Sequence, residues 1–160
     1  IALNCRAKLP AEKAWVDELS HRLQSTPFAP GDRNVLYGLK EMSIDGHLCL
    51  SRMDVDRIFA AALANPGVGT GIAAMLHSWR ADYLWLSQKD MPAARAALSK
   101  SLTLNPGNPS NRLKWGQLMY LDGEREAARV LLLALQGENL SAQERKTLDD
   151  LLASYGNAGG

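Results

Sequence analysis

The 160-residue sequence has almost no net charge and no long apolar run. Its 18 basic residues are nearly balanced by 17 acidic ones, which leaves a formal charge of +1. No block of lysine and arginine is present that could neutralise a run of phosphates, which argues against nucleic acid as a partner. No segment approaches the roughly 20 apolar residues that a helix needs to cross a bilayer. We therefore expect no membrane span in this chain.

Cysteine is scarce as well. Cys5 and Cys49 do not form a CxxC motif or a zinc-ligand spacing, which argues against a metal knuckle. In an oxidising compartment they could form a disulfide that contributes about 2–4 kcal/mol by closing a long loop. The alternative is two unpaired thiols. Residue spacing alone leaves both open.

Motifs that carry catalysis or bind cofactors are also lacking. The sequence contains no nucleophile elbow, zinc-protease, phosphate-loop or dinucleotide fingerprint. His21, His47 and His77 lie far apart, and we interpret His47 as a turn residue beside Cys49. The glycines of Gly67–Gly71 follow no strand and are interpreted as a linker. We therefore predict a non-catalytic chain with no cofactor-binding residue and no metal ligand.

The composition is that of a folded protein. Hydrophobic residues make up 46% and charged residues 22% of the chain, values that are ordinary for a soluble globular domain. The length fits one domain or a short run of stacked repeats. The chain begins at Ile1 without a signal peptide and ends in the polar stretch Asn157–Gly160, so we expect it to be a piece of a longer protein.

The N-terminal third is predicted to hold three helices of unequal length. The first covers Pro10–Gln24, with apolar residues at helical spacing on one side: Trp15, Val16, Leu19 and Leu23. A loop rich in proline, residues 25–32, precedes a short second helix near residues 35–42 and an Asp-Gly turn at 45–46. A third helix starts at Met53 or Asp54, with Ser51 and Asp54 in capping-box spacing, and ends at Asn65-Pro66.

The remaining two thirds read as helical hairpins. We expect one long helix over Ile72–Ser87, a second within Asp90–Pro106 and a third from Asn108 to Leu121, followed by an Asp-Gly turn. A shift of 34 residues places the segment 90–98 on the segment 124–132 and aligns four identical pairs: Ala93 with Ala127, Ala94 with Ala128, Arg95 with Arg129 and Leu98 with Leu132. The period indicates an array of helix pairs, in which each pair covers the apolar face of its neighbour.

This period resembles that of tetratricopeptide repeats over residues 72–136. The small-residue, proline and large apolar positions of that pattern are filled by Ala94, Leu98, Pro106, Gly116, Ala128 and Leu132. In the first copy Asp82 stands where glycine or alanine is usual, and Ser101 where alanine is usual.

The resemblance implies an all-α fold, a tetratricopeptide-like helical-hairpin array (an α-α superhelix) with a C-terminal capping helix. We expect residues 1–66 to form an irregular helical segment that packs on the array, and residues 67–157 to hold the repeats and the cap, in what amounts to one structural domain. Ser141 and Glu144, in capping-box spacing, mark the start of that last helix.

Such arrays line a groove with the first helix of each pair. In the 34-residue register this face carries Trp79, Tyr83, Gln117 and Tyr120, which we name as candidate groove residues. Aromatic side chains in a groove suit contact with a peptide or a glycan. The alternative is that these rings fill the core of the repeats.

A second resemblance concerns the stretch "DGHLCLSRMDVDRIFAAALANP" together with the later "LTLNP". They resemble the soluble C-terminal region of bacterial membrane O-antigen polymerases, O-antigen ligases and protein O-glycosylation ligases. In such relatives a second cysteine stands near the position of Glu41 or Met42, where this chain has none. The resemblance implies that Cys5 replaces it as the partner of Cys49. It also implies that catalysis and membrane attachment belong to parts of the parent protein outside this chain.

These observations predict an interaction or scaffolding domain. The expected place is the periplasmic face of the bacterial inner membrane, as part of an envelope enzyme of O-antigen or glycoprotein assembly, with a protein, peptide or glycan partner. A stand-alone adaptor in pilus or outer-membrane assembly is the alternative, and two free thiols would favour a cytoplasmic adaptor. A hydrolase is the third class, but the sequence offers no positioned nucleophile and base.

Overall fold

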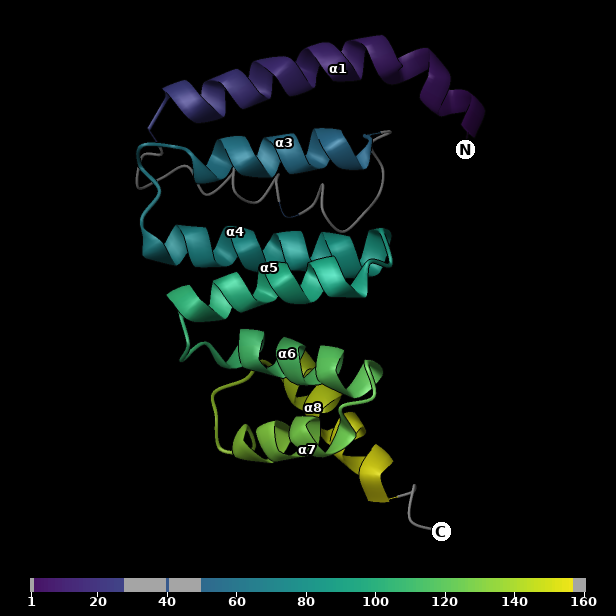
Figure 1. Ribbon diagram of the computed structural model, residues 1–160, viewed down its shortest axis with the longest axis vertical. Coiled ribbons are helices and arrows are strands. Elements are labelled where there is room, and N and C mark those ends of the chain that lie inside the picture. Colours follow the sequence, from purple (N-terminus) through teal and green to yellow (C-terminus); the bar gives the residue numbers. More distant parts are fainter. Residues whose placement is uncertain (1, 28–39, 41–49, 157–160) are drawn as a thin grey trace.

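A computed structural model describes residues 2–27, 40 and 50–156, and every regular element within these ranges is a helix (Figure 1). The elements are α1 (Ala2–Ser25), α3 (Arg52–Leu63), α4 (Thr70–Asp82), the π-helical turn η1 (Tyr83–Ser87), α5 (Met91–Leu104), α6 (Pro109–Leu121), α7 (Arg125–Ala134) and α8 (Ala142–Gly156). The prediction of an all-α fold is confirmed.

The helices stack along the long axis of the molecule, with α1 at one end of the stack and α7 and α8 at the other (Figure 1). Helix α1 packs on α3, α4 packs on α5, and α6 packs on α7. Further contacts join α3 to α4 and α5 to α6, while α8 touches both α6 and α7. Short turns connect α4 through η1 to α5, and α6 to α7, so these four helices form two hairpins in sequence.

Side-chain caps explain why the helices begin where they do. The Asp90 carboxylate accepts a hydrogen bond from the Ala93 amide at 3.0 Å, and the Asn108 side chain accepts one from the Asn111 amide at 2.9 Å. Each cap satisfies an amide that the first turn leaves without a partner. Ser51 and Asp54 form the reciprocal capping box of α3. The predicted starts of these three helices are therefore confirmed.

The core runs through the stack without interruption from α1 to α6. Its fully buried side chains include Val16, Ile58, Phe59, Leu76, Leu84, Leu98 and Leu118. A second cluster, formed by Leu113, Leu132, Leu135 and Leu148, lies between α6, α7 and α8. Helix α8 thereby covers the last hairpin, and its capping box between Ser141 and Glu144 forms as predicted. This is the place that was expected for a terminal cap.

The 34-residue period holds for the second helix of each hairpin. Ala94 and Leu98 of α5 and their counterparts Ala128 and Leu132 of α7 are all fully buried. Gly116 of α6 lies against α7 so closely that a Cβ atom there would be 2.8 Å from Cδ2 of Leu132. Gly116 thus has the close-packing role that its position in the pattern predicts.

The first helix of the first hairpin follows a different register. The buried residues of α4 and η1 match those of α6 at a separation of 35 residues: Leu76 with Asn111, Ser78 with Leu113, Ala81 with Gly116 and Tyr83 with Leu118. The extra residue is accommodated by η1, because a π-helical turn holds one more residue than an α-helical turn. Ala81, and not Asp82, therefore occupies the small-residue position, which corrects the expected alignment.

Helix α1 also differs from its prediction. It begins at Ala2, so Pro10 lies inside the helix rather than in its first turn. Val16 and Leu23 are buried, whereas Trp15 is 43% exposed because it lies beside this stripe rather than on it. Apart from Lys40, the predicted second helix near residues 35–42 lies outside the described part of the structure. The same holds for the Asp-Gly turn at 45–46, for Cys49 and for the side chain of Cys5.

Candidate functional site

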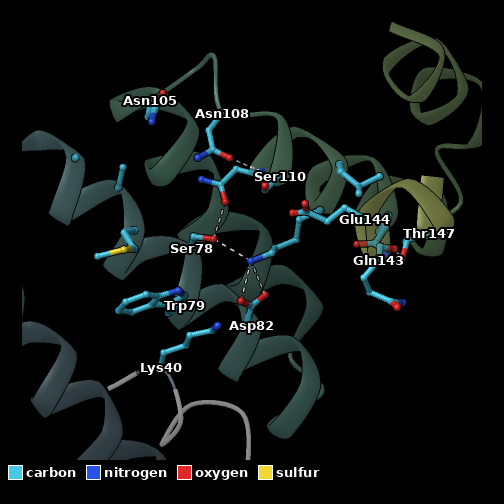
Figure 2. Close-up of a pocket in the computed structure, with 17 residues that line it drawn as sticks. Lys40, Ser78, Trp79, Asp82, Asn105, Asn108, Ser110, Gln143, Glu144 and Thr147 are labelled. Carbon is cyan, nitrogen blue, oxygen red and sulfur yellow. Dashed lines mark hydrogen bonds and ion pairs between the residues drawn. The ribbon is translucent and has the colours of Figure 1, made fainter. Parts of the chain in front are cut away.

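A groove of about 560 Å³ lies between α4, α6 and α8 (Figure 2). Ser78, Trp79 and Asp82 of α4 face it from one side, and Gln143, Glu144 and Thr147 of α8 from the other. Between them α6 contributes Ser110, Asn111, Leu113, Lys114 and Gln117. The remaining lining residues are Lys40, Gly71, Ala74, Met75, Asn105 and Asn108. The site is thus built by the first helix of each hairpin and the terminal cap.

An ion pair crosses the floor of this groove from α4 to α6. Nζ of Lys114 lies 2.7 Å from the Asp82 carboxylate and also donates a hydrogen bond of 2.9 Å to Oγ of Ser78. The side chains of Lys114 and Asp82 are only 18% and 14% exposed. Their close contact satisfies charges that burial would otherwise leave without water.

Behind the ion pair, hydrogen bonds continue through three helices. The Ser78 hydroxyl donates to Oδ1 of Asn111 at 2.7 Å, and Nδ2 of Asn111 donates to Oγ of Ser101 at 2.9 Å. The Ser101 hydroxyl in turn donates to the backbone carbonyl of Ala74 at 2.6 Å. Because each donor in this series of hydrogen bonds has one acceptor, the series fixes the orientation of the three side chains. It also gives a physical reason for serine at position 101, where the repeat pattern has alanine.

Two carboxylates of the groove have shifted acidities. Burial raises the pKa of Asp82, although the Lys114 charge, the hydrogen bond from Lys114 and the Lys40 charge act in the opposite direction. Burial also acts to raise the pKa of Glu144, but hydrogen bonds from Ser110 and Ser141 outweigh it and lower that pKa. With two lysines, one aspartate and one glutamate among its described lining residues, the groove has no net formal charge.

Several polar groups of the lining remain available to a ligand. In the described ranges, the side-chain amides of Asn105, Gln117 and Gln143 make no hydrogen bond within the protein, and Asn108 uses its oxygen alone. Trp79 packs partly against the core and borders the groove with the remainder of its ring (Figure 2). These groups offer donors, acceptors and one aromatic surface.

The structure brings together two of the four candidate groove residues. Trp79 and Gln117 line the groove. Tyr83 is only 5% exposed and belongs to the core, because the 35-residue register aligns it with the buried Leu118. Tyr120 packs edge-to-face on Tyr155 of α8, with 5.4 Å between the ring centroids, and does not line the groove. The expected placement of Tyr83 and Tyr120 is therefore wrong.

Sequence reasoning missed the polar floor. Lys114 and Asp82 are 32 positions apart, and nothing in their immediate surroundings distinguishes them from solvated charges on a helix face. Alignment of Ala81 with Gly116 would have revealed them, since it places α4 and α6 in register and brings Asp82 and Lys114 to the same face.

Nothing in the described ranges forms a group of three or more histidine, cysteine, aspartate or glutamate side chains that could hold a metal ion. His77 is half-buried on α4, and burial together with the charges of Lys100 and Arg80 lowers its pKa, but it does not line the groove. His21 is exposed on α1, and His47 lies outside the described residues. A search of the described helices found none with the length and apolar character of a membrane span.

Comparisons with family models, with curated proteins and with solved structures gave no match to this chain.

Proposed function

We propose that this chain is a non-catalytic interaction domain that holds its ligand in the groove between α4, α6 and α8. The observation that carries the proposal is the hydrogen-bond chain behind the groove, which ties Lys114 through Ser78, Asn111 and Ser101 to the backbone of α4. A floor fixed in this way is oriented before a ligand arrives, as in most small-ligand sites. The unused amides at the rim then provide the contacts.

The same hydrogen bonds argue against hydrolysis at this site. Ser78 and Lys114 lie 2.9 Å apart, which is the distance of a nucleophile from its base. The Ser78 hydroxyl, however, already donates to Asn111, while the Lys114 ammonium donates to Ser78 and is held by Asp82. The acceptor of the serine hydrogen is an amide oxygen, which is not a base, so the pair supports a positioning role.

The binding groove is tested by blocking it. Gln117→Arg introduces a longer, charged side chain into the lining, whereas Gln24→Arg makes the same change at an exposed position of α1. Arrays of unmodified peptides and of oligosaccharides are probed with the parent protein and both variants. We expect ligands of the parent to be lost by Gln117→Arg and kept by Gln24→Arg. Equal binding by both variants would place the ligand elsewhere and refute the proposal.

We further propose that the domain is the soluble, periplasmic part of a bacterial membrane glycan polymerase or ligase. The support is the resemblance carried by residues 45–66 and 102–106. A stand-alone adaptor in pilus or outer-membrane assembly is the second candidate, favoured by the hairpin stack itself. Reading the gene upstream decides between them: several apolar segments of about 20 residues support the enzyme, and their absence supports the adaptor.

The compartment is tested by mass spectrometry of the unreduced protein with and without alkylation of thiols. A disulfide between Cys5 and Cys49 is expected for a periplasmic domain. Two free thiols in protein recovered from the periplasm would contradict the proposed location and favour a cytoplasmic adaptor.

A further inference from the structure

The described lining of the groove carries no net formal charge, because Lys40 and Lys114 balance Asp82 and Glu144. Its central ion pair, Asp82 with Lys114, is satisfied internally, and the Glu144 carboxylate accepts hydrogen bonds from the amide and the hydroxyl of Ser141. Arginine, the residue that most often recognises phosphate or carboxylate through two parallel hydrogen bonds, is not among the described lining residues. These features fit an uncharged ligand.

The groove is also a poor fit to the common modes of peptide binding. A helical peptide needs a groove that accepts apolar anchors at successive turns. Here Ala74 and Leu113 are buried in the protein itself, which leaves Trp79 and Met75 as apolar contacts for a ligand. Addition of a strand needs a free sheet edge, and the described elements are all helices.

The available groups match the hydroxyl groups of a sugar. A side-chain amide places a donor and an acceptor side by side, and neighbouring hydroxyls of a sugar can bond to both, because each hydroxyl donates and accepts. Asn105 and Asn108 lie at one end of the groove and Gln143 lies at another part of it (Figure 2), while Gln117 lines it from α6. None of these four side chains is fully used within the protein. The indole of Trp79 borders the same space and can cover the apolar C–H face of a pyranose ring.

We infer that the groove between α4, α6 and α8 binds an uncharged oligosaccharide. Trp79 covers one sugar ring, and the amides of Asn105 and Gln117 form hydrogen bonds with hydroxyl groups of the oligosaccharide. The inference rests on the proposed function, since it names the ligand of that groove. It assigns sugar recognition to residues of this chain itself.

The test compares three classes of probe on the same protein: neutral oligosaccharides, anionic oligosaccharides and unmodified peptides, each as a broad array. The strongest neutral oligosaccharide is then titrated into the parent and into single variants by calorimetry. Loss of one hydrogen bond should weaken binding roughly 3- to 10-fold in Gln117→Ala and in Asn105→Ala. Gln24→Ala, which removes an exposed amide of α1, should bind as the parent does. Thermal unfolding shows whether each variant is folded.

The outcomes separate the two proposals. Binding of neutral oligosaccharides that is weakened by Gln117→Ala and Asn105→Ala supports the inference. Binding of peptides or anionic sugars alone, blocked by Gln117→Arg, overturns the inference and leaves the proposed function standing. If the folded protein binds no probe of any of the three classes, both the inference and the proposed function are overturned.

Discussion

Single residues set how closely the second hairpin packs. Gly116 faces Leu132, and a Cβ atom at position 116 would come within 2.8 Å of Cδ2 of that side chain. Leu132 is itself fully buried, so it has little room to move away. The approach of α6 to α7 therefore depends on the absence of a side chain at this position.

We predict that Gly116→Ala lowers the free energy of unfolding by about 1–3 kcal/mol, the usual cost of overpacking a core. Gly71→Ala is the matched control, because Gly71 is also helical but has open space around its Cβ position. The control should leave stability unchanged or raise it by up to about 1 kcal/mol. Urea denaturation measures both, and equal stability of the two variants would refute the close contact.

Ser101 provides a second test at this scale. Its hydroxyl donates to the Ala74 carbonyl and accepts from Nδ2 of Asn111, so Ser101→Ala removes two buried hydrogen bonds and leaves the Asn111 amide without its acceptor. We expect a loss of about 1–3 kcal/mol in unfolding free energy. Ser99→Ala, at an exposed position of the same helix, should change stability by less than about 0.5 kcal/mol. A stable Ser101→Ala variant would mean that the chain of hydrogen bonds does not form.

Asp82 links stability to pH. Because burial raises its pKa above the ordinary value of 3.8, the folded protein holds this proton more tightly than the unfolded chain does. The contribution of protonated Asp82 to the free energy of unfolding is therefore complete below pH 3.8, and it is lost as the pH rises through the raised pKa. We predict that the parent loses stability relative to Asp82→Asn over this interval, as measured by denaturation at a series of pH values. If the parent instead gained stability relative to Asp82→Asn as the pH rises, the ion pair with Lys114 would be the dominant effect.

At the scale of elements, the π-helical turn η1 decides which residues face the groove. It holds one residue more than a regular turn, so α4 matches α6 at 35 rather than 34 positions. Asp82 consequently faces Lys114 in the groove, and Ala81 takes the buried small-residue position. The same shift moves Tyr83 into the core.

We predict that η1 tolerates the loss of one residue. Deletion of Leu86, which is 43% exposed, should convert the turn to an α-helix and cost no more than about 2 kcal/mol. Deletion of the exposed Ser99 from α5 should cost more than about 3 kcal/mol, because it rotates the following residues by about 100° and removes Ser101 from the core. Circular dichroism during thermal unfolding compares them. Equal losses would contradict the role given to η1.

Local signals in the sequence were sufficient for most elements, but not for their register. Asp90, Asn108 and Ser51 mark helix starts through short-range hydrogen bonds, and such bonds depend only on nearby residues. The one-residue shift in η1 has no such local signal, since the sequence YLWLS is compatible with either kind of turn. The candidate site inherited this error, because the 34-residue register assigned Tyr83 to the groove although its side chain is buried in the core.

For the whole molecule, α8 closes the end of the stack. Leu148 is fully buried against Leu113, Leu132 and Leu135, so removal of its side chain leaves a cavity in the second core cluster. We predict that Leu148→Ala lowers the unfolding free energy by about 2–5 kcal/mol. Leu133→Ala, at a position that is 45% exposed on α7, should cost less than about 1 kcal/mol. Comparable losses in the two variants would argue against α8 as a cap.

The groove is a property of the whole stack, since it needs both hairpins and the cap. The measurement that tests it most directly is a map of backbone amide NMR shifts during titration with the strongest ligand from the arrays. We predict that the largest shifts fall on α4, on α6 from Ser110 to Gln117 and on the start of α8, around Trp79 and Gln143. Shifts centred on the outer faces of α5 and α7, with the groove unaffected, would contradict it.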